Sequence, residues 1–303
     1  MPRARRIPTF MMGADPELAL FKNGRFYNAD NIEGLSISDR FGKDGCGAIV
    51  ELRPTPAEEP SQLVENLRIC LAEGLEKYPA IRRCELKAGS YYGGHPIGGH
   101  IHFGTRNVRR DSYPNIVSCL DATVAQITVP LEERAPALAR RSSYGGLGDW
   151  REQRWGFEYR APSSWMTSPK IPLGVLSLAK VVVTEALLDA DGSFLRQCHT
   201  LLSGAAGFTV TRIRRMAANL PTIRGALGEC HLYPKYNKDI EFLYALVLDG
   251  RTWMTDRTLS EEWGLATSFP ARGRVRLPSR GSLPNILAPQ TLEGLLRGQV
   301  NIA

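Results

Sequence analysis

Short apolar runs bounded by turn residues dominate the first half of the chain and predict β-strands. Their apolar positions alternate with polar ones or are filled by β-branched and aromatic residues, as in half-buried or buried strands. Two of the runs end at Pro54 and Pro162, where a residue without a backbone N–H stops a strand. The predicted strands cover residues 13–22, 25–28, 47–54, 84–91, 98–105 and 155–162.

Longer stretches with apolar residues at helical spacing predict helices between and after these strands. Leucine recurs at every fourth position from Leu63 to Leu75, on one face of a helix that begins at Ser61. Further helices are predicted at residues 115–133, 171–189 and 239–249. The segment 171–189 is strongly apolar, but Lys180 and Glu185 interrupt it, so we expect a core helix and not a membrane anchor.

The order of these elements predicts an α+β fold with a largely antiparallel sheet, because strands and helices do not alternate strictly. No convincing linker divides residues 1–250, which we predict to be one domain. From residue 264 the periodicity is lost, and five arginines stand against one glutamate. We therefore predict that residues 251–303 are a basic extension that packs on the domain or makes subunit contacts, and a homo-oligomer is possible.

The composition and net charge of the chain indicate which classes of protein and partner to expect. The chain has 303 residues, of which 43% are hydrophobic and 23% charged, which excludes a disordered or fibrous chain. A net charge of +7 favours anionic partners such as nucleotide phosphates, nucleic acid or acidic metabolites. Six scattered cysteines without a C-x-x-C pair indicate reduced thiols. With no secretory signal or long apolar segment in sight, we predict a cytoplasmic protein that does not use a membrane.

Four predicted strands carry polar pairs at the i, i+2 spacing that puts two side chains on one face. The pairs are Asp15 with Glu17, Glu51 with Arg53, His100 with His102, and Glu158 with Arg160. If these strands share one sheet, the pairs line one concave face. Carboxylates with an imidazole suit Mg²⁺ or Mn²⁺, and guanidinium groups suit phosphate oxygens.

Three more arginines, Arg141, Arg151 and Arg154, fall in a predicted loop at residues 140–154. Metal-binding carboxylates beside several arginines favour phosphoryl transfer. The chain contains no G-x-x-x-x-G-K-[ST] loop, no dinucleotide fingerprint and no G-x-S-x-G elbow. A nucleotide would therefore have to bind on the face of the sheet.

The motifs GADPEL, VELRP, GGHIHFG and R-x-x-Y-G…WR…FEYR, in this order, resemble those of the phage-encoded carboxylate–amine ligases, or amidoligases. That family is grouped with glutamine synthetase and glutamate–cysteine ligase. The resemblance covers about residues 12–165. It implies a curved catalytic sheet of the glutamine-synthetase type that surrounds ATP and divalent metal ions. It also implies an enzyme that phosphorylates a carboxylate and lets an amine displace the phosphate.

Carried over position by position, the resemblance assigns a role to each candidate residue. It implies Mg²⁺ or Mn²⁺ ligands at Asp15, Glu17, Glu51, His100 and Glu158, with His100 and His102 as alternatives for the imidazole. It implies that Arg160 contacts the transferred phosphate and that Arg141 and Arg151 contact phosphate or the acyl carboxylate. Arg53, Arg154 and His102 complete the predicted ATP site. Asp15 stands where a glutamate is common, so the number of metals, two or three, stays open.

Two other functions are compatible with the residues alone. The His-x-His pair with nearby carboxylates also suits a metal-dependent hydrolase. The +7 charge also suits a nucleic-acid-binding phage protein. For a ligase, the predicted partners are a carboxylate and an amine, each a small molecule or borne on a macromolecule, and a phage enzyme would act in the host cytoplasm.

Overall fold

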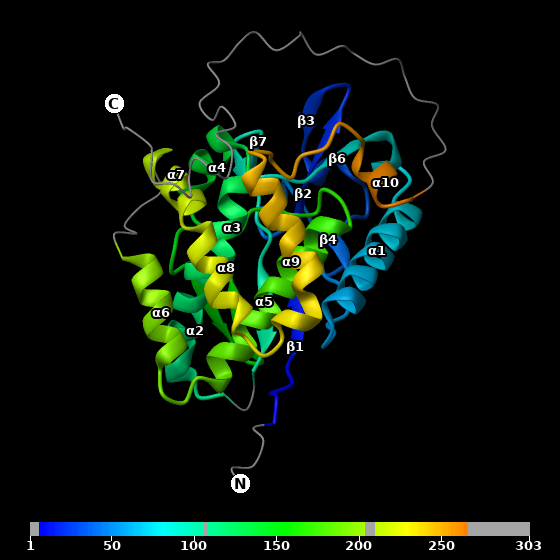
Figure 1. Ribbon diagram of the computed structural model, residues 1–303. Helices are drawn as coiled ribbons and strands as arrows, with labels where there is room; N and C mark the ends of the chain where they lie inside the picture. The colour runs from blue at the N-terminus through cyan, green and yellow to red at the C-terminus, as the bar shows by residue number, and fades with distance from the viewer. Residues whose placement is uncertain (1–5, 106–107, 204–209, 266–303) are drawn as a thin grey trace, which may run out of the picture.

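The computed structural model of the protein describes residues 6–105, 108–203 and 210–265 (Figure 1). Its strands are β1 (Met11–Ala14), β2 (Glu17–Lys22), β3 (Arg25–Tyr27), β4 (Phe41–Lys43), β5 (Val50–Leu52), β6 (Glu85–Lys87), β7 (Tyr91–Tyr92), β8 (His95–Pro96), β9 (Ile101–Gly104), β10 (Trp150–Gln153) and β11 (Gly156–Tyr159). Its α-helices are α1 (Pro60–Lys77), α2 (Tyr113–Leu120), α3 (Gln126–Thr128), α4 (Arg134–Arg141), α5 (Lys170–Leu188), α6 (Ser193–Leu202), α7 (Val210–Ala218), α8 (Leu220–Gly228), α9 (Tyr233–Leu248) and α10 (Leu259–Glu262).

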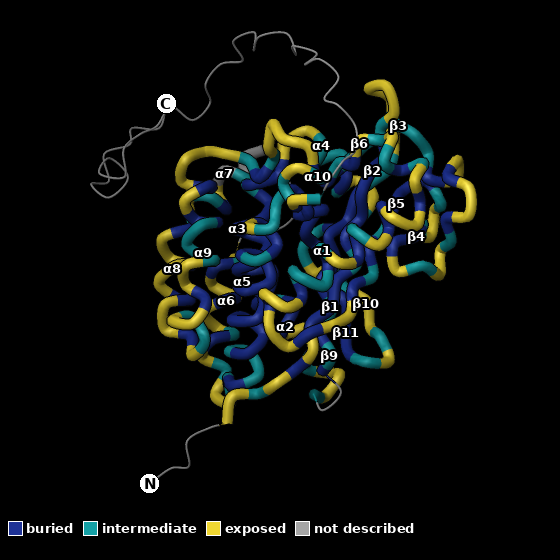
Figure 2. Tube along the Cα trace, turned by 90° about the vertical axis from the view of Figure 1, so that its right-hand side faces the viewer, coloured by how far each residue is buried: buried dark blue, intermediate teal, exposed yellow. Residues whose placement is uncertain are grey.

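The fold contains two main antiparallel sheets. The first has the strand order β1-β9-β11-β10, and the second has the order β3-β2-β5-β4, with β6 also paired to β2. Strands β7 and β8 form a separate hairpin. The strands gather on one side of the molecule, and most of the helices cover the other side (Figure 2). This arrangement confirms the predicted α+β fold with largely antiparallel sheets and helices on one face.

The prediction of a single strand over residues 13–22 is wrong, because the strand is interrupted at Asp15 and Pro16. Pro16 has no N–H to donate to a ladder. Strand β1 therefore ends before it, and β2 begins after it in the other sheet. The backbone N–H groups of Asp15 and Glu17 donate to the carbonyl oxygens of His100 and Gly98, at 3.4 and 2.9 Å. The break places Asp15 at the junction of the two sheets.

Two further predictions about secondary structure need correction. The strand predicted at residues 84–91 is divided into β6 and β7. Between them Gly89 has a φ of +143°, which L-residues with side chains rarely adopt. The loop predicted at residues 140–154 is wrong at both ends: α4 continues to Arg141, and residues 150–153 form β10. Strand β10 pairs with β11 in a hairpin that turns at Arg154 and Trp155.

Helix α5 forms the centre of the helical layer, as predicted for the segment 171–189. It packs against α2 and α9 and also contacts α1. By length and composition it is the one described helix that could cross a membrane, but 72% of its apolar window is buried in the protein. The leucines predicted to face the core from α1 are likewise buried.

Helices α6, α7 and α8 were not predicted. Residues 251–265 lie against the rest of the fold: the backbone N–H of Trp253 donates to the carbonyl oxygen of Leu131, and the indole N–H of Trp263 donates to that of Met166, both at 2.9 Å. The rest of the predicted basic extension, residues 266–303, lies outside the described residues. The domain boundary at residue 250 stays a prediction.

Candidate active site

One row of residues crosses the four-stranded sheet and carries the polar side chains of the candidate site. The register pairs His102 of β9 with Gly13 of β1 and with Glu158 of β11, and it pairs Glu158 with Arg151 of β10. Directly opposed residues of neighbouring strands project to the same face of a sheet. A Cβ atom at Gly13 would lie 3.3 Å from the Cβ of His102, so a glycine here leaves room for the imidazole.

Asp15 extends this row from the sheet junction and contacts both histidines. Its Oδ1 lies 3.1 Å from Nδ1 of His100, and its Oδ2 lies 3.2 Å from Nε2 of His102. Nδ1 of His100 also lies 3.4 Å from Oε1 of Glu158. The structure therefore brings together two carboxylates and two imidazoles from segments far apart in the sequence, as their spacing predicted.

The charges in this cluster depend on one another. Burial alone would raise the pKa of Asp15, but His100 and His102 hold it well below its ordinary value. Burial likewise opposes the charged form of His100, yet Asp15 raises the pKa of that imidazole. Asp15 is thus held as a carboxylate, the form that binds a cation.

A divalent cation fits the buried atoms to which this cluster gives no hydrogen bond. Oδ1 of Asp15, Nε2 of His102 and Oε1 of Glu158 lie near the oppositely charged groups named above, but none of their contacts within the described residues has hydrogen-bond geometry. One ligand atom from each of these residues lies within 4.8 Å of the other two. Buried polar atoms without partners are costly, and a metal ion bound among them would remove that cost.

Two more acidic residues face each other on the second sheet. Glu17 of β2 and Glu51 of β5 are register partners. Burial, with Asp15 as the next cause, raises the pKa of Glu51 to about 9, and burial raises that of Glu17. Oε2 of Glu17 accepts hydrogen bonds from the backbone N–H of Gly98 at 2.6 Å and from the hydroxyl of Tyr144 at 3.4 Å. A carboxyl group with so high a pKa keeps a proton at neutral pH, and a metal cation bound beside it would displace that proton.

Two of the predicted arginines reach the site. Arg151 donates from Nε and Nη2 to Oε2 of Glu158, at 2.9 and 2.7 Å. Nε of Arg160 lies 3.3 Å from Oε1 of Glu158, and its Nη1 lies 3.2 Å from Asp149. The side chain of Arg151 is 58% exposed, so it is accessible to a ligand. Arg154 is exposed in the β10–β11 turn, and its predicted role stays a prediction.

Arg53 lies on the side of Glu51. Its Nη2 lies 2.5 Å from Oε2 of Glu51 and also donates to the carbonyl oxygen of Lys43. Nη1 donates to the carbonyl oxygen of Asp39 at 2.9 Å. These bonds fix the guanidinium beside the acidic residues of the second sheet.

The hydrogen bonds of Arg141 go to Glu132 and to backbone carbonyl groups and not to Asp15 or Glu158, and the role predicted for it stays a prediction. Its guanidinium is buried and forms a bidentate ion pair with Glu132, at 2.6 and 2.8 Å. It also donates to the carbonyl oxygens of Ala137 and Ala161. Arg141 lies on α4 and not in a loop, and the helix directs it into the core. It therefore holds α4 against the segment that follows β11.

Several residues at the site were not predicted. The ring of Tyr144 lies between two guanidinium groups, 4.6 Å from that of Arg140 and 4.7 Å from that of Arg160. The indole of Trp155 lies over the imidazole of His102, with ring centroids 5.0 Å apart. Tyr144 was visible as part of the R-x-x-Y-G motif, but no spacing rule connects it with Glu17 or Arg160.

A cavity of about 360 Å³ opens on the cluster from the side of β1 and β5. Its polar lining comes from Asp15, Glu51, Arg53 and His102, and Trp155 forms part of the wall. The cavity therefore gives a ligand access to the carboxylates of Asp15 and Glu51 and to the imidazole of His102.

Two comparisons with known proteins found a match to this chain. A family model described as Phage phiEco32-like COOH.NH2 ligase-type 2 matches residues 8–265. A search of curated proteins found no match to the sequence. A solved structure with a similar fold is the complex of the prokaryotic ubiquitin-like protein Pup with its ligase PafA, at 12% identity and a TM-score of 0.45. The match covers 79% of this chain and 63% of that chain, so this chain spans less than two thirds of it. On the family match, this chain belongs to the phage phiEco32-like type 2 family of carboxylate–amine ligases.

Proposed function

We propose that the protein joins a carboxylate to an amine at the expense of ATP, through an acyl phosphate. The observation that carries this proposal is the convergence of Asp15, His102 and Glu158 beside Arg151 and Arg160. Acidic and imidazole ligands next to guanidinium groups provide for both a divalent cation and the phosphate oxygens of a nucleotide. The family match supports amide-bond formation as the outcome.

Asp15, His102 and Glu158 would hold Mg²⁺ or Mn²⁺, with Glu17 and Glu51 on the other side of the junction. Such an ion, when bound, neutralises phosphate oxygens and so favours transfer of the γ-phosphoryl group. His100 contacts both Asp15 and Glu158 and keeps their carboxylates oriented. We therefore place His102 among the ligands and His100 behind them.

The arginines act on the oxygens that gain charge during transfer. A guanidinium has five N–H donors, more than Arg151 and Arg160 use on Glu158 and Asp149. The remaining donors orient the substrate carboxylate as one of its oxygens bonds to the γ-phosphorus and the bond to the ADP oxygen breaks. In the second step the amine nitrogen bonds to the acyl carbon, phosphate leaves with the C–O electron pair, and the nitrogen loses a proton.

Phosphate release tests this proposal. We expect release to require ATP, Mg²⁺, a carboxylate and an amine together, with hydroxylamine as a general amine whose hydroxamate products are detected by colour with Fe³⁺. Glu158→Gln should abolish product because it removes the charge from a carboxylate that is 1% exposed. Glu152→Gln, on the neighbouring strand but 44% exposed, is the matched control and should remain active.

Two results would contradict the proposal. Full hydroxamate formation by Glu158→Gln would show that the cluster does not take part in the reaction. Hydrolysis of a substrate by the wild-type protein with metal but without ATP would instead identify a metal-dependent hydrolase.

A further inference from the structure

The ring of Tyr144 connects an arginine that is locked to the backbone with an arginine of the candidate active site. Arg140 is fully buried, and its two Nη atoms donate to the carbonyl oxygens of Arg160 and Ala161, both at 2.8 Å. The guanidinium carbon of Arg140 lies 4.6 Å from the centroid of the Tyr144 ring, and that of Arg160 lies 4.7 Å from it. The fixed guanidinium of Arg140 thus holds the ring against the side chain of Arg160.

Hydrogen bonds alone fix the guanidinium of Arg160 only loosely. Among the residues that the structure describes, this group makes one hydrogen bond, from Nη1 to Oδ1 of Asp149 at 3.2 Å. Its Nε lies 3.3 Å from Oε1 of Glu158, but both atoms are buried without a hydrogen bond in the described part of the chain. An aromatic ring attracts a guanidinium through its quadrupole, most strongly where water is excluded. The ring of Tyr144 therefore restricts a planar group that one hydrogen bond would leave free to rotate.

The segment that carries Tyr144 is itself held in place. The backbone N–H of Tyr144 donates to the carbonyl oxygen of Arg140 at 3.1 Å, and that of Gly145 donates to Oδ2 of Asp149 at 2.6 Å. Gly145 has a φ of +81°, and a Cβ atom there would lie 2.0 Å from Nη1 of Arg140. A glycine at this position thus allows both the turn and the close approach of the arginine.

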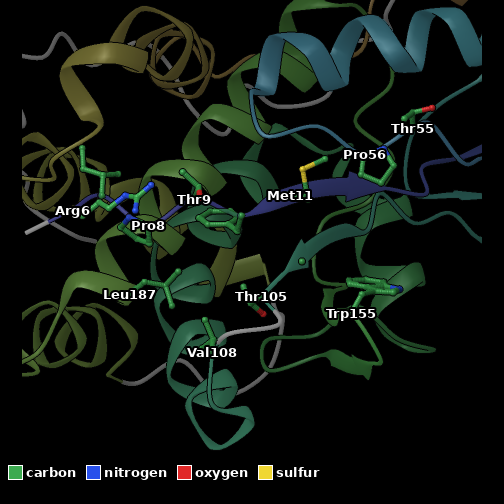
Figure 3. Close-up of a pocket in the computed structure, with 13 residues that line it drawn as sticks. Arg6, Pro8, Thr9, Met11, Thr55, Pro56, Thr105, Val108, Trp155 and Leu187 are labelled. Atoms are coloured by element: carbon green, nitrogen blue, oxygen red, sulfur yellow. The ribbon is translucent and has the colours of Figure 1, made fainter.

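Tyr144 acts on other side chains and does not line the cavities beside the cluster. It lines neither the cavity of about 360 Å³ over the acidic residues nor a larger pocket of about 900 Å³ next to it. Trp155 lines both, and Figure 3 shows its indole at the wall of the larger pocket. The hydroxyl of Tyr144 instead donates to Oε2 of Glu17, at 3.4 Å.

Resting on the ligase function proposed above, we propose that Tyr144 is a positioning residue whose ring holds the guanidinium of Arg160 toward the phosphate oxygens of ATP. Arg140 fixes the ring, and the ring fixes Arg160. Without the ring, Arg160 has the competent orientation for only part of the time, and the apparent affinity for the nucleotide falls by that fraction. The hydroxyl contributes less, because its hydrogen bond is long.

NMR of the full-length protein labelled with ¹⁵N-arginine tests the contact without nucleotide or turnover. The Nε–H signal of Arg160 is identified by its absence from Arg160→Met. Tyr144→Leu should shift and broaden this signal, because the ring no longer lies beside the guanidinium, whereas Tyr144→Phe keeps the ring and should restore the signal. Tyr27→Leu is the matched control: its ring lies 5.1 Å from Nζ of Lys22 on the edge strand β3, and its loss should leave the Arg160 signal unchanged.

A double-variant cycle tests whether the contact matters for the nucleotide. Calorimetric titration with the ATP analogue AMP-PNP at saturating Mg²⁺ compares the wild type, Tyr144→Leu, Arg160→Met and the double variant. Tyr144→Leu should weaken binding about 5- to 25-fold, the range expected for loss of a partly to fully desolvated contact between a ring and a cation. Tyr144→Phe should bind within about 2-fold of the wild type. In the Arg160→Met background, loss of the ring should weaken binding no further, because the ring acts through Arg160.

Three results would overturn the assignment: an unchanged Arg160 signal in Tyr144→Leu, equal affinities of Tyr144→Leu and the wild type for AMP-PNP, or additive losses in the double variant. Additive losses would show that Tyr144 supports the fold of its segment and not Arg160. Tyr144→Met takes the place of Tyr144→Leu in both tests if the latter does not fold. A wild-type protein that binds no AMP-PNP, but whose Arg160 signal depends on the ring, would support the positioning of Arg160 and contradict the ATP-dependent function.

Discussion

Substitution of Arg141 tests whether this arginine stabilises the fold or takes part in the reaction. The side chains of Arg141 and Glu132 are 2% and 0% exposed, and two short hydrogen bonds join them. Burial alone would raise the pKa of Glu132, but the charge of Arg141 keeps it below its ordinary value. Removing one partner of a buried ion pair leaves an uncompensated charge and costs about 3–5 kcal/mol. Arg141→Met should lower the free energy of unfolding by that amount.

The assay is denaturant unfolding at neutral pH, together with ligase turnover by the protein that remains folded. The double variant Arg141→Met with Glu132→Gln should recover part of the loss, since the amide oxygen can still accept from the backbone N–H of Ser163 and the amide NH₂ can donate to the hydroxyl oxygen of Ser90. Arg151→Met should show the reverse pattern. Its partner Glu158 is 1% exposed but keeps its contacts with Arg160, Gln153 and His100, so removal of Arg151 should cost less stability than removal of Arg141, while turnover is lost.

Two outcomes would refute this reasoning. If Arg141→Met left the free energy of unfolding unchanged and abolished turnover, Arg141 would belong to the chemistry, as its sequence position first indicated. If the double variant were less stable than Arg141→Met alone, the loss would not come from an unpaired charge at Glu132.

Three further predictions concern other parts of the fold. Burial raises the pKa of Asp121 to about 7, so the folded protein keeps a proton that the unfolded chain releases near pH 4. The protonated carboxyl of Asp121 therefore contributes its full stabilisation below about pH 4, and this contribution is lost as the pH rises through 7. Asp121→Asn should reduce the fall in unfolding free energy between pH 5 and 8 by about 2–3 kcal/mol. An unchanged fall would contradict this prediction. A Cβ at position 98 would lie 2.3 Å from Nε2 of His100, so Gly98→Ala should impair turnover, whereas Gly225→Ala has open space and should not; equal activity of the two would contradict it. Mn²⁺ should raise the melting temperature of the wild type but not of Asp15→Asn, and an equal rise in both would place the metal elsewhere.

The sequence was a good guide to the residues of the cluster and a poorer guide to their support. The i, i+2 spacing of His100 with His102 and of Glu158 with Arg160 holds, because both pairs lie at regular strands or their ends. The spacing of Asp15 and Glu17 predicted one strand, yet β1 ends before Asp15, and β2, in the other sheet, begins at Glu17. They still approach one site because only Pro16 separates them.

The roles of the loop arginines could not be read from the chain. Arg141 and Arg151 have the same charge, and their contacts depend on whether a helix or a strand contains them. The pairing of Arg141 with Glu132 is a contact that secondary-structure patterns do not specify. The contact of the Tyr144 ring with the guanidinium of Arg160 likewise depends on the fold and could not be predicted from the sequence.

Oxygen transfer is the most direct test of the central claim that this cluster supports activation of a carboxylate by ATP. The acid substrate, labelled with ¹⁸O in its carboxylate, is incubated with ATP, Mg²⁺ and an amine, and the released phosphate is analysed by mass spectrometry. We predict one ¹⁸O in each phosphate from the wild type and no labelled phosphate from Glu158→Gln. Amide product accompanied by unlabelled phosphate would show that the carboxylate is never phosphorylated.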